Sequence, residues 1–379
     1  MPFGSLFGSG DKAKAQSPTR RTSSTGSTLK ERGYTEGKRL GKGSFGYAVL
    51  LVRHDKDVGE CYVGKFIKYK HMSANEKNYV LREVKTMAHI SNDGGHPYLV
   101  RFRESFTLVN GPLCIVMDFC DSGDLAQLIS SQRRKKTFFQ EGQIHLWLLQ
   151  LLSAIDFLHS IKVLHRDVKP ANVFMHSGSS ICKLGDMGLS KQTIKAATAP
   201  GTHTNCGSPL YLAPEVHMAQ PYGKMVDIWA LGCTLFEMMT FEHAFQGPNN
   251  TEILQNIVWA RHAKIRGDGD VWGDGLCTLV KHMLSLKPED RPEASDILGD
   301  PIFAEALQSG ALNPKALRHR KIGADPTGAT DKYNEWFNAI VASPTDVLDV
   351  EMIERPASAP PTTDRQRENA SKSKQIQHA

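Results

Sequence analysis

The spacing of hydrophobic residues changes once along this chain. From about 34 to 117 the apolar residues form short strand-like runs, such as Ala48 to Val52 and Tyr62 to Ile67. One segment in this part, Glu76 to Ile90, instead repeats apolar residues at helical spacing. Helical spacing dominates after Gly123. The pattern predicts an α+β protein, with a β-rich part that includes one helix followed by a mainly α-helical part.

The periodic segments lie between residues 34 and 303, which we expect to form one domain. Residues 1–33 are rich in Ser, Thr and Gly, with six basic and two acidic residues, and are predicted to be disordered. Residues 304–379 are also predicted to be largely disordered, with a short amphipathic helix near 331–342 that includes Tyr333 to Val341. The tail has no heptad repeat, so it predicts no coiled-coil dimer and leaves the oligomeric state open.

Composition places the chain among ordinary soluble globular proteins. Of its 379 residues 40% are hydrophobic and 23% are charged, and it has no run of eighteen apolar residues and no signal-peptide core. The seven cysteines lack the spacing of a metal site or a disulfide framework, which favours a reducing compartment. We therefore expect a cytoplasmic protein without a membrane partner.

The net charge of +6 is mild for this length. The most basic run is Arg133-Arg134-Lys135-Lys136, which lies between two segments with helical spacing. Basic runs can bind nucleic acid or acidic lipid, but this one has no interleaved aromatic residues on which bases could stack. We interpret it as a solvated loop between two helices and expect no nucleic-acid partner.

The most informative stretch runs from His165 to Gly188 and reads HRDVKPANVFMHSGSSICKLGDMG. It contains Asp167, Asn172 and Asp186, separated by five and fourteen residues. Oxygen-bearing side chains suit Mg²⁺ and phosphoryl transfer, in which the protein mainly positions groups and neutralises charge. Asp167 would accept the proton of a substrate hydroxyl, and the other two residues would hold the metal. Asp-x4-Asn alone arises often by chance, whereas the full string very rarely does.

A glycine-rich loop precedes this stretch in the sequence. It lies between two strand-like runs and consists of Gly41, Lys42, Gly43, Ser44, Phe45 and Gly46. Glycines let backbone amides approach phosphate oxygens without obstruction by side chains. The Rossmann dinucleotide fold uses the same spacing, but there the loop opens a helix, whereas here a second strand follows. Lys65, in the next strand, would bind the phosphates of a nucleotide.

Such a lysine needs a carboxylate to hold it in place. Glu83 follows Lys65 by eighteen residues and borders the apolar stripe of the predicted helix, formed by Val80, Val84 and Met87. It can therefore face inward toward Lys65 and form an ion pair with it. The alternative is a solvated glutamate on the surface of the helix.

Together these segments resemble the eukaryotic protein kinases. The resemblance implies a two-lobed fold with a β-rich N-lobe, one regulatory helix and a mainly helical C-lobe, and it implies ATP and Mg²⁺ as cofactors. It also implies further nucleotide contacts: the gatekeeper Met117, the backbone of Asp118 and Cys120 at adenine, Asp124 near the ribose, and Phe174 as the floor under the base. Ala48 and Val63 would pack against the adenine ring.

Within that family two residues indicate serine/threonine specificity. Lys169, two residues after Asp167, would stabilise the transferring phosphoryl group, and Ser208, six residues before Pro214, would touch the catalytic Asp and Lys. The acceptor is thus expected to be a Ser or Thr of a protein substrate.

The resemblance also implies an activation segment from Asp186 to Glu215. Glu215 would pair with Arg291, and Asp227 would anchor the backbone of the catalytic loop. Arg166 would bind a phosphate on Thr204, with Thr198 and Thr202 as alternatives, which implies an upstream kinase or trans-autophosphorylation. An apolar column linking the lobes would consist of His165, Met187, Met87 and Phe102.

The segments IVMDFCDSGDLAQLI, HRDVKPANVF and DIWALGCTLFEMMTFEHAF are similar to those of the NIMA-related (NEK) kinases. This resemblance covers about 270 residues. It implies a role in the cell cycle, or at the centrosome, basal body, cilium or flagellum, on substrates with an apolar residue three before the acceptor.

The sequence departs from the kinase pattern at three places. Met187 stands where the metal-binding triplet usually has Phe, Ala48 where the strand after the loop usually has Val, and Val63 where a smaller residue usually precedes the lysine. None of these changes removes a charged group. The alternatives are a serine/threonine kinase of another family, a pseudokinase scaffold, which usually loses Lys, Asp or a metal ligand, and a small-molecule kinase, which lacks the long segment ending at Glu215.

Overall fold

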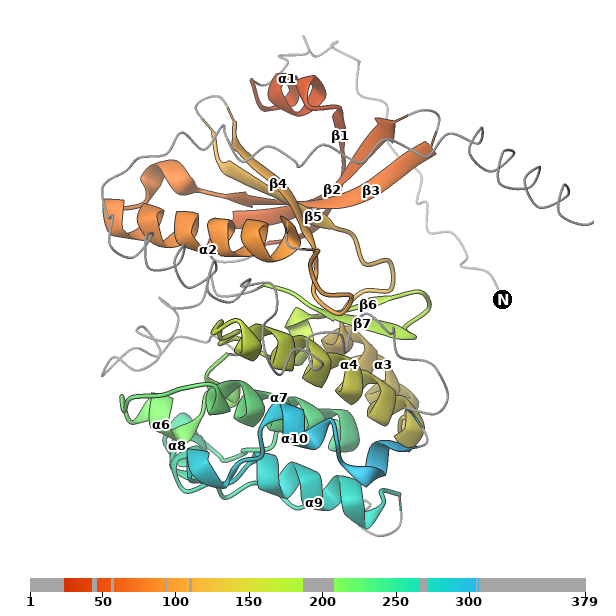
Figure 1. Cartoon of the computed structure of the whole chain (residues 1–379), viewed down its shortest axis with the longest axis vertical. Helices are drawn as coiled ribbons and strands as arrows, with labels where there is room; N and C mark the ends of the chain where they lie inside the picture. The colour runs from red at the N-terminus through yellow and green to blue at the C-terminus, as the bar shows by residue number, and fades with distance from the viewer. Residues whose placement is uncertain are drawn as a thin grey trace, which may run out of the picture.

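The computed structural model describes residues 24–42, 46–55, 58–92, 94–108, 111–186, 208–265, 271–304 and 306. These residues form two lobes, one above the other in Figure 1. The N-lobe is an antiparallel sheet in the order β1-β2-β3-β5-β4 with one long helix. Its elements are β1 (Tyr34–Lys42), β2 (Gly46–Asp55), β3 (Val58–Ile67), η1 (Tyr69–His71), α2 (Ala74–Asn92), β4 (Phe102–Thr107) and β5 (Leu113–Asp118). The predicted α+β fold and its two-lobed division are confirmed.

Strand β5 is buried on both faces, and alternate residues join two different apolar clusters. Leu113, Ile115 and Met117 pack with α2, whereas Cys114 and Val116 pack on the opposite face of the sheet. The side-chain period of two in a strand requires this division. The face that carries Met117 is the one from which Lys65 projects, because Lys65 lies opposite Ile115.

The C-lobe is built around α7 (Met225–Thr240), of which nearly every residue is buried. Helices α4, α9 and η4 all contact it, and the short β6–β7 hairpin lies above them (Figure 1). The C-lobe elements are α3 (Leu125–Lys135), α4 (Glu141–Ser160), η2 (Pro170–Asn172), β6 (Val173–His176), β7 (Ile181–Leu184), η3 (Ser208–Tyr211), α6 (Pro214–His217), α8 (Asn250–Val258), α9 (Asp274–Met283), η4 (Pro288–Asp290), α10 (Ala294–Ile297) and η5 (Pro301–Phe303). None of the described helices combines the length and the apolar character that a bilayer span requires.

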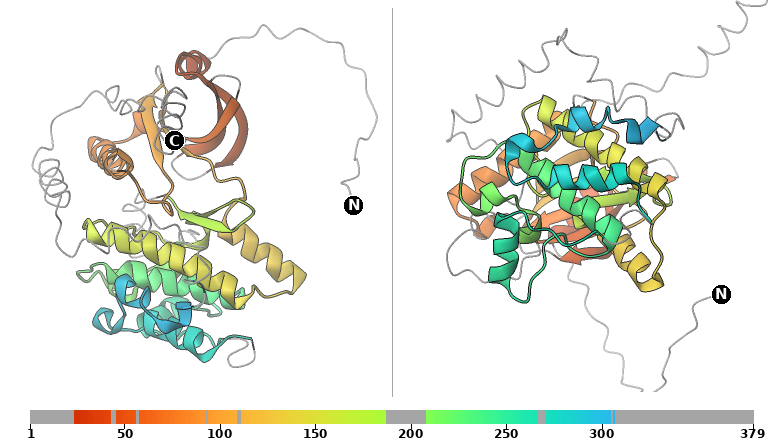
Figure 2. Two further views of the ribbon diagram at one scale, coloured as in Figure 1. Left: turned by 45° about the vertical axis from the view of Figure 1, so that its right-hand side comes forward. Right: turned by 90° about the horizontal axis from the view of Figure 1, so that it is seen from below.

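The expectation that all of residues 1–33 are disordered is wrong for its last part. Helix α1 (Ser24–Glu31) lies on the face of the sheet opposite α2 (Figure 2), with Leu29 only 1% exposed. Arg32 then donates a hydrogen bond to the buried Glu104 of β4 (3.1 Å), and the hydroxyl of Tyr34 donates another (2.6 Å). A buried carboxylate is costly without such partners, so this segment is ordered by tertiary contacts that composition does not reveal.

The basic run at 133–136 was also interpreted wrongly. Arg133, Arg134 and Lys135 form the last turn of α3, and Lys136 is its C-cap in the left-handed conformation (φ 55°). Their side chains are exposed, as expected. Basic side chains at this end interact favourably with the partial negative charge of the last carbonyl groups, so the helix continues where a loop was predicted.

The ion pair expected between Glu215 and Arg291 is present in the C-lobe core. Both side chains are at least 96% buried, and two guanidinium nitrogens donate to the two carboxylate oxygens at 2.7 and 2.9 Å. The other donors of Arg291 bind the backbone carbonyls of Ser285, Leu286 and Met225. All five N–H groups of the guanidinium are thus used, which no lysine could reproduce.

Leu29→Ala should lower the free energy of unfolding by about 2 kcal/mol, because it removes a buried side chain from the α1–sheet contact. Lys30→Ala is the matched control, since Lys30 is exposed in the same turn and should change stability by less than about 0.5 kcal/mol. Urea denaturation of the full chain measures both. Equal midpoints for the two variants would mean that α1 does not contribute to the stability of the N-lobe.

Arg291→Ala should cost about 3–5 kcal/mol, because it leaves the buried carboxylate of Glu215 without its partner. The control is Lys224→Ala, which breaks the exposed Lys224–Glu293 pair (2.6 Å) and should change stability by less than about 1 kcal/mol. The measurement is again urea denaturation. A cost for Arg291→Ala no larger than that of the control would contradict the structural role given to this pair.

Candidate active site

The catalytic loop lies between α4 and β6, and its backbone is held by one carboxylate of α7. Asp227, which is 1% exposed, accepts hydrogen bonds from the amides of His165 (3.0 Å) and Arg166 (2.8 Å) and contacts Nε2 of His159 (2.9 Å). Desolvation raises the pKa of Asp227, but the hydrogen bond and charge of His159, with the backbone hydrogen bond from Arg166, outweigh it, so the pKa lies below its usual range. The anchoring role expected of Asp227 therefore has a structural basis.

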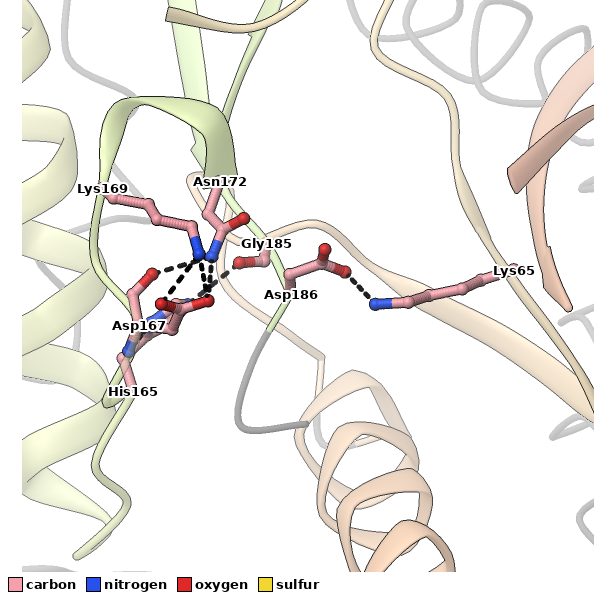
Figure 3. A network of polar contacts seen from close by, with 7 residues as sticks. All are labelled: Lys65, His165, Asp167, Lys169, Asn172, Gly185 and Asp186. Carbon is pink, nitrogen blue, oxygen red and sulfur yellow. Dashed lines mark hydrogen bonds and ion pairs between the residues drawn. The ribbon is translucent and has the colours of Figure 1, made fainter. Parts of the chain in front are cut away.

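Asp167, Lys169 and Asn172 converge as the sequence predicted (Figure 3). The ammonium of Lys169 donates to both carboxylate oxygens of Asp167, at 2.9 and 2.7 Å. The amide nitrogen of Asn172 donates to Oδ2 of Asp167 (2.8 Å) and to its backbone carbonyl (2.8 Å). The carboxylate of Asp167 thus accepts hydrogen bonds at both oxygens and is held in a single orientation, as a group that takes a proton must be.

His165 connects this loop to the segment that carries Asp186. Its Nε2 lies 3.0 Å from the carbonyl of Gly185, and its Nδ1 lies 3.3 Å from the amide of Asp167. The carbonyl only accepts and the amide only donates, so the ring is neutral with its proton on Nε2. Complete burial lowers the pKa of His165, which favours the same state. Of the predicted apolar column, His165, Met87 and Phe102 are buried, and Met187 lies outside the described residues.

Lys65 and Asp186 form an ion pair between the lobes, 2.6 Å from Nζ to Oδ1 (Figure 3). Asp186 has a left-handed backbone (φ 56°). Desolvation raises its pKa, but the charge and hydrogen bond of Lys65 outweigh that effect and hold the pKa below its usual range. The carboxylate therefore stays charged at neutral pH.

The partner predicted for Lys65 was Glu83, and the ion pair found for Lys65 is with Asp186 instead. Glu83 does lie on the inner side of α2, with both carboxylate oxygens shielded from solvent, so the alternative of a solvated glutamate is wrong. The sequence identified both Glu83 and Asp186 as residues of the site, but it could not decide which of the two carboxylates lies nearer to the ammonium of Lys65.

The residues expected around a nucleotide line one face of the N-lobe sheet. Ala48 lies opposite Lys65, and Val63 lies opposite Met117 in the adjacent strand pair. Asp118 ends β5, where its amide binds the carbonyl of Arg101 (3.0 Å) and its side chain pairs with Arg103. Cys120 follows at the crossing to the C-lobe.

Below this face lie Phe174 and Asp124. Phe174 is in β6 beside Gly185, where an added Cβ would come within 2.8 Å of the Phe174 ring. Gly185 is therefore needed for close packing against Phe174, a requirement that the sequence analysis missed. The carboxylate of Asp124 caps α3 and binds the amide of Gln127 (2.9 Å), so in this structure the helix end uses the group expected near the ribose.

The glycines of the loop are needed for different reasons. A Cβ on Gly46 would lie 1.7 Å from the carbonyl oxygen of Phe66, so the β2–β3 contact itself excludes a side chain. A Cβ on Gly41 would meet no atom of the described residues within 4 Å. Lys42 ends β1, and Gly43, Ser44 and Phe45 lie outside the described residues.

The residues present fit a Mg²⁺ ion. The amide nitrogen of Asn172 is directed at Asp167, so its oxygen points away from that carboxylate (Figure 3). Asp186 uses one carboxylate oxygen for Lys65, and the other completes a pair of hard oxygen donors. Two protein ligands of this kind suit Mg²⁺, which takes its remaining ligands from water and substrate phosphates. No larger cluster of His, Cys, Asp or Glu suited to a metal occurs in the described part of the chain.

The expected phosphate-binding site is only partly described. Arg166 has a left-handed backbone (φ 67°), and its Nε is buried without a hydrogen-bond acceptor among the described residues. Thr198, Thr202 and Thr204 lie outside the described residues, and of Ser208 only the backbone is described, at the start of η3.

The sequence analysis also missed Tyr211, which follows Ser208 by three residues. Its hydroxyl lies 2.5 Å from the carboxylate of Glu237 in α7, and it lines a cleft beside Asp167 together with Leu212, Tyr222 and Val226. The signal was available, because Glu237 is the only charged residue in the second half of α7.

Comparisons with known proteins agree with this geometry. A model of the protein kinase domain matches residues 34–303. Serine/threonine-protein kinase Nek1 of Mus musculus is 36% identical over 284 residues, which are 75% of this chain and 22% of Nek1. Serine/threonine-protein kinase nekl-2 of Caenorhabditis elegans is 30% identical over 301 residues, 77% of this chain and 81% of that protein.

Among solved structures, the crystal structure of Rad53 1-466 in complex with AMP-PNP covers 72% of this chain and 65% of its own, with a TM-score of 0.57 and 21% identity. That likeness supports the fold alone. The chain spans about a fifth of the length of mouse Nek1 but most of nekl-2. With the kinase motifs brought together in one site, these matches show that the chain belongs to the NIMA-related (NEK) family of serine/threonine protein kinases.

Proposed function

We propose that this chain is an active protein serine/threonine kinase that transfers the γ-phosphoryl group of ATP to a Ser or Thr hydroxyl of a protein substrate. The observation that carries the proposal is the contact set of Asp167, whose carboxylate binds Lys169 at 2.7 Å and Asn172 at 2.8 Å. The interlobe pair of Lys65 and Asp186 supports it. A pseudokinase scaffold usually lacks at least one of these groups.

The reaction assigns one role to each side chain. Asp167 accepts the proton of the substrate hydroxyl while the oxygen of that hydroxyl forms a bond to the γ-phosphorus of ATP. The bond between the γ-phosphorus and the β–γ bridging oxygen breaks, and ADP is released. Lys169 neutralises charge on the transferring group, and Lys65 binds the phosphates of the nucleotide. Asn172 and Asp186 would hold Mg²⁺, which supplies charge neutralisation at the phosphates.

Lys65 therefore serves two partners. Its ammonium pairs with Asp186, and on nucleotide binding it would turn toward the phosphates and leave that carboxylate to the metal. The shielded carboxylate of Glu83 belongs to α2, which packs on the face of the sheet that carries Lys65, and it would hold Lys65 in that state. Such an exchange of partners would account for both the observed pair of Lys65 with Asp186 and the expected pair of Lys65 with Glu83.

The same proposal includes a switch. A phosphate on Thr204 carries a charge of about −1.5 to −2 and would bind the guanidinium of Arg166. The buried Nε of Arg166, without an acceptor among the described residues, supports this site. An upstream kinase or trans-autophosphorylation would supply the phosphate. Family membership further supports a role in the cell cycle or at the centrosome, basal body or cilium, with a cytoplasmic or cytoskeletal location.

Asp167→Asn should lower the rate of phosphorylation of a generic protein such as casein at least 100-fold, because it removes the proton acceptor. Asp274→Asn, at an exposed position in the first turn of α9, is the control and should retain full activity. Incorporation of labelled phosphate measures both, and mass spectrometry maps phosphorylated positions on the chain. Undiminished activity in Asp167→Asn would show that another group takes the proton.

Gly41→Ala should raise the KM for ATP about threefold to tenfold without a change in stability. The added methyl group meets no atom of the described residues within 4 Å, so a loss reports on a ligand that approaches the loop. Gly142→Ala in α4 also meets nothing within 4 Å and is the matched control. An unchanged KM would indicate that the nucleotide does not approach Gly41.

A further inference from the structure

The chain crosses from the N-lobe to the C-lobe between β5 and α3, and each end of this crossing is bonded to one lobe. On the N-lobe side β5 ends at Asp118, whose amide donates to the carbonyl of Arg101 (3.0 Å). On the C-lobe side the amide of Ser122 donates to the carbonyl of Met175 in β6 (3.0 Å), and the amide of Met175 donates to the carbonyl of Gly123 (2.8 Å). Three residues lie between these attachments.

Those three residues are Phe119, Cys120 and Asp121, and they differ in how they are held. No backbone hydrogen bond joins Phe119 or Cys120 to any residue that the structure describes. The backbone groups of Cys120 are the ones expected to bind adenine, so they are left available for a ligand. Asp121, the last of the three, is instead bound through its side chain.

The partner of Asp121 is the turn between β6 and β7, in the hairpin at the junction of the two lobes (Figure 1). Ser177, Gly178 and Ser179 in this turn all have left-handed backbones, with φ of 51°, 67° and 71°. Glycine adopts this conformation readily, whereas it costs free energy for serine. A turn with two such serines persists only where surrounding contacts hold it.

The crossing supplies two of these contacts. A carboxylate oxygen of Asp121 accepts a hydrogen bond from the amide of Ser177 (3.0 Å), and the hydroxyl of Ser122 accepts one from the amide of Gly178 (3.2 Å). The Ser122 hydroxyl in turn donates to the same oxygen of Asp121 (2.7 Å), and Nδ1 of His176 lies 3.3 Å from that oxygen. We use the term Asp121 clamp for this set of contacts.

Helix α4 also holds the turn. Nε1 of Trp147 donates to the carbonyl of Ser179 (2.8 Å), and the side-chain amide of Gln150 donates to the carbonyl of Ser180 (3.2 Å) and accepts from the amide of Cys182 (2.7 Å). Trp147 and Gln150 are at most 2% exposed. The Asp121 clamp therefore joins the crossing to a turn that is itself fixed to a core helix of the C-lobe.

The carboxylate of Asp121 is suited to this role although it is half exposed. The hydrogen bond from the Ser122 hydroxyl is the largest influence on the pKa of Asp121, and with the charge of His176 and the amide of Ser177 it outweighs desolvation and holds that pKa below its usual range. The group is therefore ionised at neutral pH. A charged acceptor forms stronger hydrogen bonds than a neutral one.

We propose that Asp121 is a positioning residue for the nucleotide, an inference that rests on the proposed function. The Asp121 clamp fixes the C-lobe end of the crossing, which holds the free backbone groups of Cys120 in place relative to Phe174, the predicted floor under the base in β6. Movement of one lobe relative to the other then occurs about Phe119 and Cys120. Loss of the clamp weakens ATP binding without a change at Asp167.

Asp121→Ala should raise the KM for ATP about threefold to tenfold, because it removes hydrogen bonds that hold the crossing, and should leave kcat within about twofold. Asp121→Asn keeps an oxygen that can accept from the amide of Ser177 and should restore the KM. Asp300→Ala is the matched control, since Asp300 accepts a hydrogen bond from the amide of Ile302 at the same distance (3.0 Å) in η5 and should leave the KM unchanged.

Hydrogen exchange without nucleotide tests the clamp itself. The amides of Ser177 and Gly178 should exchange roughly tenfold faster in Asp121→Ala than in the wild type or in Asp300→Ala. Unchanged exchange would overturn the clamp. Faster exchange with an unchanged affinity for ATP, measured by calorimetry with Mg²⁺, would overturn the positioning role and leave a purely structural one.

The same calorimetry separates this inference from the proposed function. Binding of ATP by the wild type without phosphate transfer to casein would contradict the proposed function, while weaker binding by Asp121→Ala would still support the positioning role. Absence of ATP binding by the wild type would overturn both.

Discussion

The catalytic geometry depends on one buried carboxylate. Asp227 accepts hydrogen bonds from two successive amides, those of His165 and Arg166, and the second of these residues has a left-handed backbone that costs free energy for any residue other than glycine. The paired hydrogen bonds compensate that cost. They also determine where the next residue, Asp167, begins. Because α7 is almost entirely buried, close packing holds this carboxylate in place, and the loop takes its position from the central helix of the C-lobe.

A series of contacts connects the catalytic loop to the segment that carries Asp186 and then to the N-lobe. The neutral ring of His165 binds the carbonyl of Gly185, which brings Asp186 into place next to it. Strand β7 is fixed in turn by the segment before β4, since Leu184 exchanges backbone hydrogen bonds with Tyr98 (2.8 Å) and Val100 (2.9 Å). Lys65 then reaches Asp186 from β3.

Two of the departures from the kinase pattern, Ala48 and Val63, lie on the same face of the N-lobe sheet. Ala48 lies opposite Lys65 on β2, and Val63 lies opposite Met117 on β3. Both therefore belong to the face of the sheet that also carries Lys65, where a nucleotide base would pack. Ala48 on β2 is smaller than the usual residue, and Val63 on β3 is larger. The space lost beside Val63 is thus offset by space gained beside Ala48. Neither exchange affects the charged groups that hold the phosphates and the metal.

The sequence by itself determined the fold class, and its motifs predicted which side chains would gather around Asp167. The resemblance to the protein kinases implied the pair of Glu215 and Arg291, which lie seventy-six residues apart. The fold class follows from the spacing of apolar residues, including the alternation along a strand such as β5, which local backbone geometry imposes. Only the tertiary structure decided which carboxylate pairs with Lys65, because that choice depends on how closely the lobes approach. It also decided that residues 24–31 form a helix, since Leu29 and Arg32 gain their stability from a sheet face and a buried Glu104 seventy-two residues away from Arg32. Local composition describes a chain surrounded by water, whereas these contacts arise from surfaces that exist only once the N-lobe has folded.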